Sequence, residues 1–166
     1  MVAALHFVLD HNFPTLPEVR WPPSIAISRL KDVDHRLIEG FEDWHVLLAL
    51  HQRGGVDAFV TQDAGMLSLP TELVVLSLTR LCLVVTSDSG QSPTRASGLL
   101  LAGLEVIANR IRNEGPRIFV LAMRLIAKDV HAEINRVAQH QRGTPPELIA
   151  REMGKVGDLE QPVLPL

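Results

Sequence analysis

The sequence has one cysteine, no tyrosine, and aromatic side chains at only 4% of its 166 residues. Cys82 has no second cysteine to pair with, so an intramolecular disulfide is excluded and a reducing compartment is expected. Because Cys82 lies in an apolar run with only Arg80 as a nearby basic residue, we expect it to be an inert core residue. The scarcity of aromatic side chains argues against base-specific RNA recognition by stacking platforms.

The sequence also lacks long apolar segments and a strong excess of positive charge. No apolar run approaches the roughly 20 residues needed to span a bilayer, and no basic segment followed by an apolar stretch opens the chain. These absences predict a cytoplasmic protein that makes no membrane contact. The formal net charge of −3 gives no support for tight nonspecific nucleic-acid binding. Residues 1–90 carry 6 basic against 11 acidic side chains, whereas residues 91–166 carry 10 against 8.

Hydrophobic residues make up 46% of the chain, which is enough for one domain with a complete hydrophobic core. Short apolar runs alternate with helical patterns, which predicts an α/β fold with a mainly parallel sheet between two helical layers, a three-layer α/β/α arrangement. Strands are expected at 3–9, 24–30, 58–61, 73–76 and 118–123, with 81–85 open between a strand and a buried loop. Helices are expected at 43–53, 95–113 and 124–141, with shorter helical segments at 16–19, 35–41 and 64–67. We assign 1–143 to the domain and the proline-rich segment 144–166 to a C-terminal tail or partner-binding arm.

The stretch from Asp43 to Leu67 organises the prediction. Val46, Leu47 and Leu50 form an apolar stripe on a helix that the glycines at 54 and 55 end. The apolar run 58–61 then predicts a buried parallel strand. Asp63 follows the carboxyl end of that strand, where ligands bind in open α/β sheets.

Three acids occupy positions that a parallel sheet would bring together. Asp10 follows the first strand, Asp43 begins the central helix, and Asp63 follows the strand after it. Clustered carboxylates repel one another, and a divalent cation such as Mg²⁺ or Mn²⁺, which prefers oxygen ligands, stabilises their charged forms. Such a site activates a water for in-line attack on a phosphodiester. Asn12 or Thr61 would orient that water or hold a carboxylate.

The segments LDHNFP, DWHVLLALHQRG and FVTQDAGML, within residues 5–67, resemble the PIN-like nucleases, in particular a compact branch that opens with Leu-Asp-Glu-Asn-Leu-Pro. The resemblance implies a three-layer α/β/α fold, metal-dependent hydrolysis of RNA by three or four acids, and frequent use as the toxin of a toxin–antitoxin pair. It assigns catalysis and metal binding to Asp10, Asp43 and Asp63, with Asn12 and Thr61 as accompanying polar residues. The expected partners are RNA, an antitoxin protein and a second copy of the chain in a homodimer.

The sequence departs from that branch at two positions. His11 stands where the branch usually has Glu, and Gly65 stands where an acid is common. Glu42 is our candidate for the missing metal ligand. Glu39 and Asp88 are alternatives, and His11 is a candidate donor of a hydrogen bond to a phosphate.

Other interpretations of the same residues stay open. Asp43 can serve only as a helix N-terminal residue, and Asp63 can serve only to fix a turn. An incomplete acid set would give a binding module that docks RNA or a protein without cutting. A haloacid dehalogenase-type phosphatase also has Asp after its first strand, but it usually needs a second acid at the position of Asn12. His45 and His51 are six residues apart and do not indicate a zinc pair.

Overall fold

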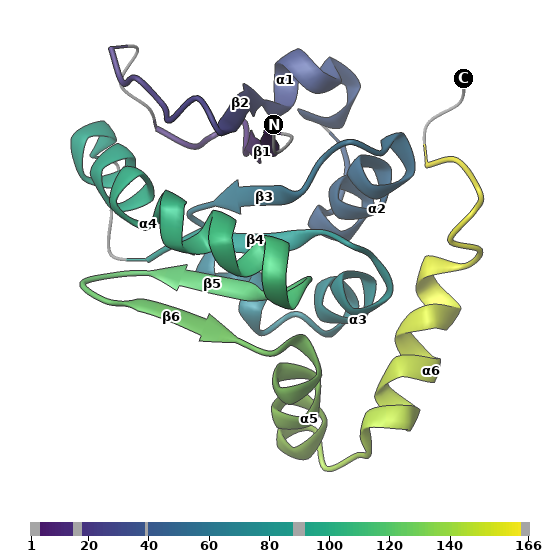
Figure 1. Cartoon of the computed structure of the whole chain (residues 1–166). Coiled ribbons are helices and arrows are strands. Elements are labelled where there is room, and N and C mark those ends of the chain that lie inside the picture. Colours follow the sequence, from purple (N-terminus) through teal and green to yellow (C-terminus); the bar gives the residue numbers. More distant parts are fainter. Residues whose placement is uncertain (1–3, 15–17, 39, 88–91, 164–166) are drawn as a thin grey trace.

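The computed structural model describes residues 4–14, 18–38, 40–87 and 92–163, and its centre is one six-stranded sheet (Figure 1). The strands are β1 (Leu5–Leu9), β2 (Ile25–Arg29), β3 (Ala58–Thr61), β4 (Cys82–Thr86), β5 (Ile118–Leu121) and β6 (Leu125–Lys128). Their order is β2-β1-β3-β4-β5-β6, and only the β5–β6 pair is antiparallel. The prediction of an α/β fold with a mainly parallel sheet is confirmed.

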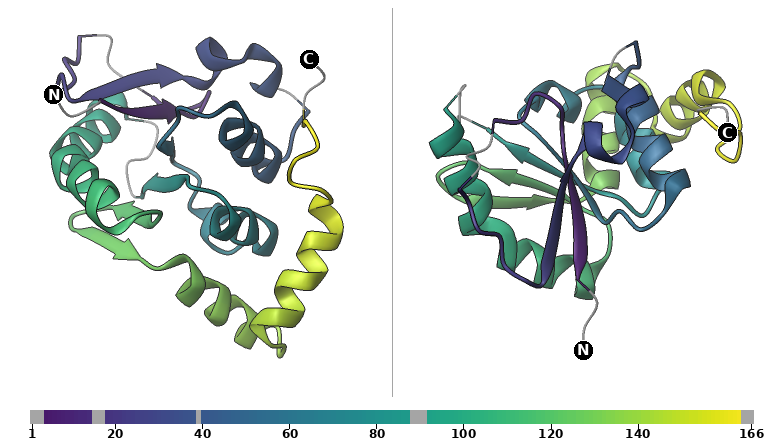
Figure 2. Two further views of the ribbon diagram at one scale, coloured as in Figure 1. Left: turned by 45° about the vertical axis from the view of Figure 1, so that its right-hand side comes forward. Right: turned by 90° about the horizontal axis from the view of Figure 1, so that it is seen from above.

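Helices cover both faces of the sheet. They are α1 (Leu30–Val33), α2 (Asp43–Arg53), α3 (Pro70–Leu78), α4 (Pro93–Glu114), α5 (Val130–His140) and α6 (Pro145–Val156), with 3₁₀ turns η1 (His35–Ile38) and η2 (Ala64–Leu67). Figure 2 shows α4 on one side of the sheet and α2 and α3 on the other, and the core divides in the same way. Alternate residues of β3 supply both halves, with Phe59 facing α2 and α3 and Val60 facing α4.

Several predicted elements match the structure closely. The strand at 58–61 and the helical turn at 64–67 have the expected bounds, and the helix at 43–53 and the strand at 24–30 are confirmed as α2 and β2. Gly54 and Gly55 adopt φ of +72° and +70°, the left-handed region in which a chain can leave a helix without a Cβ clash. The segment 81–85, which was open between a strand and a buried loop, forms most of strand β4 (Cys82–Thr86). Residues 16 and 17 of the helix expected at 16–19 lie outside the described ranges.

The prediction of a strand at 73–76 is wrong, because these residues belong to helix α3. Residues 71–76 are all buried, since α3 has the sheet on one side and α5 and α6 on the others. A helix covered on all sides loses the polar face that gives it a 3.6-residue pattern, so its apolar run resembles a buried strand. Pro70 at the first helical position was the available signal.

The prediction of a single helix at 124–141 is also wrong for the first residues of that range. Residues 125–128 form β6, an antiparallel edge strand that pairs with β5 through a tight connection. The helix begins only at Val130, where the side chain of Asp129 accepts a hydrogen bond from the Ala132 N–H and caps it. Ile126, which precedes Val130 by four residues and so fits a helical spacing, is 49% exposed on β6.

The segment 144–166 contains a helix that packs on the domain. Glu147 accepts hydrogen bonds from both the backbone N–H and the hydroxyl of Thr144, which fixes the start of α6. The helix packs against α3, with Leu148 buried and Glu152 inaccessible to solvent. Beyond it the chain returns to α2, where the Gln52 amide donates to the carbonyls of residues 159 and 161. Partner binding by this segment stays a prediction.

No helix among the described residues is long and apolar enough to cross a membrane.

Candidate active site at the carboxyl edge of the sheet

Asp10 and Asp63 lie at the same edge of the sheet because β1 and β3 are parallel neighbours. Leu9 pairs with Val60 in the register, and the Asp10 N–H donates to the Val60 carbonyl at 2.8 Å. The Thr61 hydroxyl donates to Asp10 Oδ2 at 3.0 Å and accepts the Asp63 N–H at 3.0 Å. Thr61, itself buried, therefore fixes both acids to the end of the sheet.

Asp43 reaches the same edge from the first turn of α2. Burial raises the pKa of Asp43, the negative charges of Asp10 and Asp63 raise it further, and His11 opposes them. The charges of Asp10 and Asp63 thus act on Asp43, so the three predicted acids lie within electrostatic reach of one another. Asp43 keeps the helix-start position that a purely structural role would require, but its side chain caps nothing in the described chain.

His11 and Asn12 extend this edge with exposed polar groups. His11 Nδ1 lies 2.8 Å from Asp10 Oδ1, and the Asn12 amide nitrogen lies 2.7 Å from His11 Nε2. An amide N–H donating to Nε2 leaves the imidazole proton on Nδ1, where it can donate to Asp10. Both oxygens of Asp10 are thus oriented, one by Thr61 and the other by His11.

Asp63 does fix a turn, as the structural interpretation allowed. Its Oδ1 accepts the Gly65 N–H at 2.7 Å and caps η2. A Cβ built on Gly65 would lie 2.8 Å from that oxygen, so any side chain at 65 would displace the carboxylate from its cap. Position 65, where the PIN-like pattern commonly has an acid, therefore needs glycine if the Asp63 carboxylate is to keep this orientation.

Of the candidates for a further ligand, Glu42 is exposed and accepts a hydrogen bond from the Trp44 indole N–H. It lines a hollow together with Asp43. Glu39 and Asp88 lie outside the described residues.

Glu72 is an acid near the site that sequence analysis missed. It lies in the first turn of α3, is 6% exposed, and lines the same hollow as Glu42 and Asp43. Burial raises its pKa, its own backbone N–H opposes the rise, and the charges of Asp43, Glu42 and Glu152 add to it. The mistaken strand at 73–76 hid it, and recognising Pro70 as a helix start would have placed it in a first helical turn.

The donor set suits a hard cation in its chemistry but is not preassembled. Carboxylate oxygens are the ligands that Mg²⁺ and Mn²⁺ prefer. Within the described ranges, however, no three His, Cys, Asp or Glu side chains already form a group that could hold a metal ion. A cation bound here would relieve the repulsion that adds to the raised pKa of Asp43.

Other candidate groups have structural explanations. Cys82 is fully buried, and burial raises its pKa to about 11, so its thiol is inert at neutral pH. Arg117 pairs with Glu114, and Arg112 donates a hydrogen bond to the Ser24 carbonyl. His45 stacks on Trp44 with ring centroids 3.5 Å apart.

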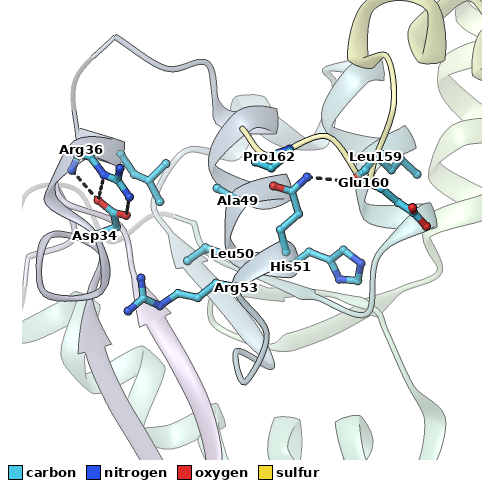
Figure 3. A pocket seen from close by; sticks show the side chains of 11 residues that line it. Asp34, Arg36, Ala49, Leu50, His51, Arg53, Leu159, Glu160 and Pro162 are labelled. Carbon is cyan, nitrogen blue, oxygen red and sulfur yellow. Dashed lines mark hydrogen bonds and ion pairs between the residues drawn. The ribbon is translucent and has the colours of Figure 1, made fainter. Parts of the chain in front are cut away.

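A second hollow, of about 540 Å³, lies beside the C-terminal half of α2 (Figure 3). Its walls include the Asp34–Arg36 ion pair, His51, and Leu159 to Pro162 of the returning C-terminal segment. None of the predicted site residues lines it. The guanidinium of Arg36 lowers the pKa of Asp34 to about 2, so that carboxylate is already satisfied.

In comparisons with known proteins, no family model, no curated protein and no solved structure matches the chain.

Proposed function

We propose that this protein is a PIN-like, metal-dependent endoribonuclease that hydrolyses RNA phosphodiesters with Mg²⁺ or Mn²⁺. The observation that supports the proposal is that Asp10 and Asp63 lie at one sheet edge and that their charges raise the pKa of Asp43, with only His11 among the described residues opposing that rise. Acids that serve only the fold are normally paired or solvated separately, because clustered charges cost free energy.

In this proposal each residue has a distinct task. Asp10, Asp43 and Asp63 would hold the cation, with Glu42 as a further ligand. When bound, the cation would lower the pKa of a water and offset the phosphate charge. Thr61 and His11 hold the two oxygens of Asp10 in place, and Asn12 holds His11. These residues would thereby orient the attacking water, and no covalent intermediate with the protein would be needed.

The direct test is Mn²⁺-dependent cleavage of single-stranded RNA by Asp10→Asn and Asp63→Asn. Each variant should lose at least roughly 100-fold in rate, because even residues that only support metal ligands commonly contribute 10- to 100-fold. Asp32→Asn, which removes an exposed acid on α1, is the matched control and should cleave normally. Unchanged cleavage in both site variants would reject the nuclease assignment.

We further propose that the nuclease acts as a toxin restrained by an antitoxin protein. Induced expression should then arrest growth, and the Asp10→Asn variant should not. A variant that arrests growth as strongly as the unmodified chain would separate the toxicity from the proposed chemistry.

The second candidate is a binding module with the same fold and an incomplete acid set. The observations that favour it are His11 and Gly65 in place of acids and the lack of a preassembled metal group in the described chain. Calorimetric titration with Mn²⁺ separates the two, since a binding module should give no heat that depends on Asp10. A haloacid dehalogenase-type phosphatase is disfavoured, because Asn12 occupies the position of its second acid and contacts His11.

A further inference from the structure

A hollow of about 470 Å³, which we call the Trp44 pocket, opens between the start of α2, the start of α3 and the end of α6. Its walls include Phe41, Trp44, Glu42, Asp43, Glu72 and Lys155. Because Asp43 belongs both to this pocket and to the proposed catalytic acids, whatever occupies the pocket lies next to the proposed cleavage site.

The pocket concentrates the few aromatic side chains that are available to a ligand. Four of the five phenylalanines are buried in the core, which leaves Phe41, Trp21 and Trp44 as the partly exposed aromatic residues. Two of these three line the Trp44 pocket. The low aromatic content of the whole chain is therefore no argument against base stacking at this pocket. Aromatic walls of this kind stack well on nucleobases.

The charged residues that line the pocket determine which ligands it favours. Three carboxylates face one cation, and Lys155 is already bound to the buried Glu152 at 2.6 Å. The pocket thus repels a phosphate and favours a group that donates hydrogen bonds. Glu72 is more than nine-tenths buried, and within the described chain its carboxylate receives a hydrogen bond only from its own backbone N–H. A buried acceptor with so few donors is costly unless a ligand satisfies it.

We propose that the Trp44 pocket binds one RNA base that carries an exocyclic amino group, stacked on Trp44 or Phe41, with Glu42 and Glu72 accepting hydrogen bonds from that amino group. This inference rests on the proposed function, because it places the base beside the bond that is cut. Carboxylates recognise the amino group of cytosine in the same way elsewhere. Uracil presents a carbonyl oxygen at that position, which would face the carboxylates and be rejected. The indole N–H of Trp44 donates to Glu42, so the stacking wall and one acceptor are held together.

The indole N–H resonances of the two tryptophans provide a test that needs neither metal nor cleavage. Trp21 packs with the core on the α4 side of the sheet and serves as the internal reference, and Trp21→Phe assigns the two signals. Cytidine should shift the Trp44 signal saturably, leave Trp21 unmoved, and bind about tenfold or more tightly than uridine, since one such contact is worth about 1–3 kcal/mol of discrimination. Glu72→Gln should remove the preference for cytidine, and so should Glu42→Gln, whose exposed site makes misfolding a poor explanation. Glu105→Gln, on the exposed side of α4, should keep it.

The outcomes separate this inference from the nuclease assignment. A shift with cytidine but no RNA cleavage would reject the nuclease and keep the pocket, whereas cleavage without a Trp44 shift would reject the pocket and keep the nuclease. Equal binding of cytidine and uridine would overturn recognition of the amino group. A Trp44 shift produced by arginine amide and by no nucleoside would assign the pocket to a cationic side chain of a protein partner, which also overturns the proposal.

Discussion

Two buried glutamates on either side of the α3–α6 contact have opposite surroundings. Glu152 of α6 accepts hydrogen bonds from Thr71 at 2.7 Å and Arg151 at 2.8 Å, and Lys155 lies 2.6 Å from its carboxylate. Burial alone would raise the pKa of Glu152, but these partners outweigh it and the pKa is lowered. Glu72, the residue next to Thr71, has acids as its charged neighbours, and its pKa is raised.

The comparison separates acids that hold the fold together from acids that are available for function. Glu133 belongs with Glu152, because Lys128 and Arg136 both pair with it and lower its pKa despite burial. Asp43 belongs with Glu72, because its neighbours repel it. Among the described residues, Glu133 and Glu152 thus have cationic partners, whereas the charges that raise the pKa of Asp43 and Glu72 are those of other acids. Perturbed, unpaired acids of this kind are where binding and catalysis are expected.

The largest stability effect should come from Glu152→Gln. The change keeps the shape but weakens two charge-assisted hydrogen bonds, each worth about 1.5–3 kcal/mol when buried. Arg151 and Lys155 are more than half exposed and regain water, so the loss should be smaller, about 1–2 kcal/mol. The midpoint of urea unfolding measures it. A neutral or stabilising result would contradict the structural role of Glu152.

Glu72→Gln, the matched change next to Thr71, should have the opposite sign. It removes a buried charge that faces other negative charges, so we expect a gain of about 0.5–1 kcal/mol in the free energy of unfolding, at the expense of function. The same urea titration measures it. Destabilisation as large as that of Glu152→Gln would show that the two acids do not differ as the comparison requires.

The sequence could predict which acids lie at the sheet edge better than it could predict the side chains and turns around them. Asp10 and Asp63 directly follow apolar strands, and parallel pairing brings such positions together whatever the details of packing. Glu72 could not be found in the same way, because its proximity to Asp43 depends on how α3 lies across the sheet. The cap that makes Gly65 necessary is likewise a property of the folded η2 turn.

The fold was predictable where the pattern was local and failed where tertiary contacts override it. The strand 58–61 is short, apolar and bounded by glycines and an acid, and sequence suffices to define it. Residues 71–76 of helix α3 are all buried because helices α5 and α6, distant in sequence, cover it. In β6, the exposed Ile126 lies on an edge strand, where pairing with β5 rather than a helical face decides the conformation.

The two glutamates should also differ in the pH range over which their variants diverge from the unmodified protein. The lowered pKa of Glu152 means that its carboxylate stabilises the fold above the ordinary value of 4.5, and this contribution is lost as the pH falls through the lower folded value. The raised pKa of Glu72 means that its ionisation destabilises the fold, and protonation relieves the cost already above 4.5. Unfolding curves at stepwise lower pH should therefore show Glu72→Gln converging on the unmodified protein first and Glu152→Gln only below 4.5. The reverse order would contradict the assignment of the two environments.

The smallest expected effect is on a single pKa, and it probes the convergence of the acids most directly. Asp10→Asn removes one of the two negative charges that raise the pKa of Asp43, so that pKa should fall, although burial, the largest cause, should keep it above the ordinary value of 3.8. Carboxyl ¹³C chemical shifts followed against pH without any metal ion measure it, and Asp32→Asn should leave the Asp43 titration unchanged. Because the measurement needs neither a cation nor RNA, it tests geometry apart from activity. An Asp43 pKa that does not respond to Asp10→Asn would mean that the carboxylates at 10 and 43 are too far apart to share a cation, and the nuclease proposal would lose its foundation.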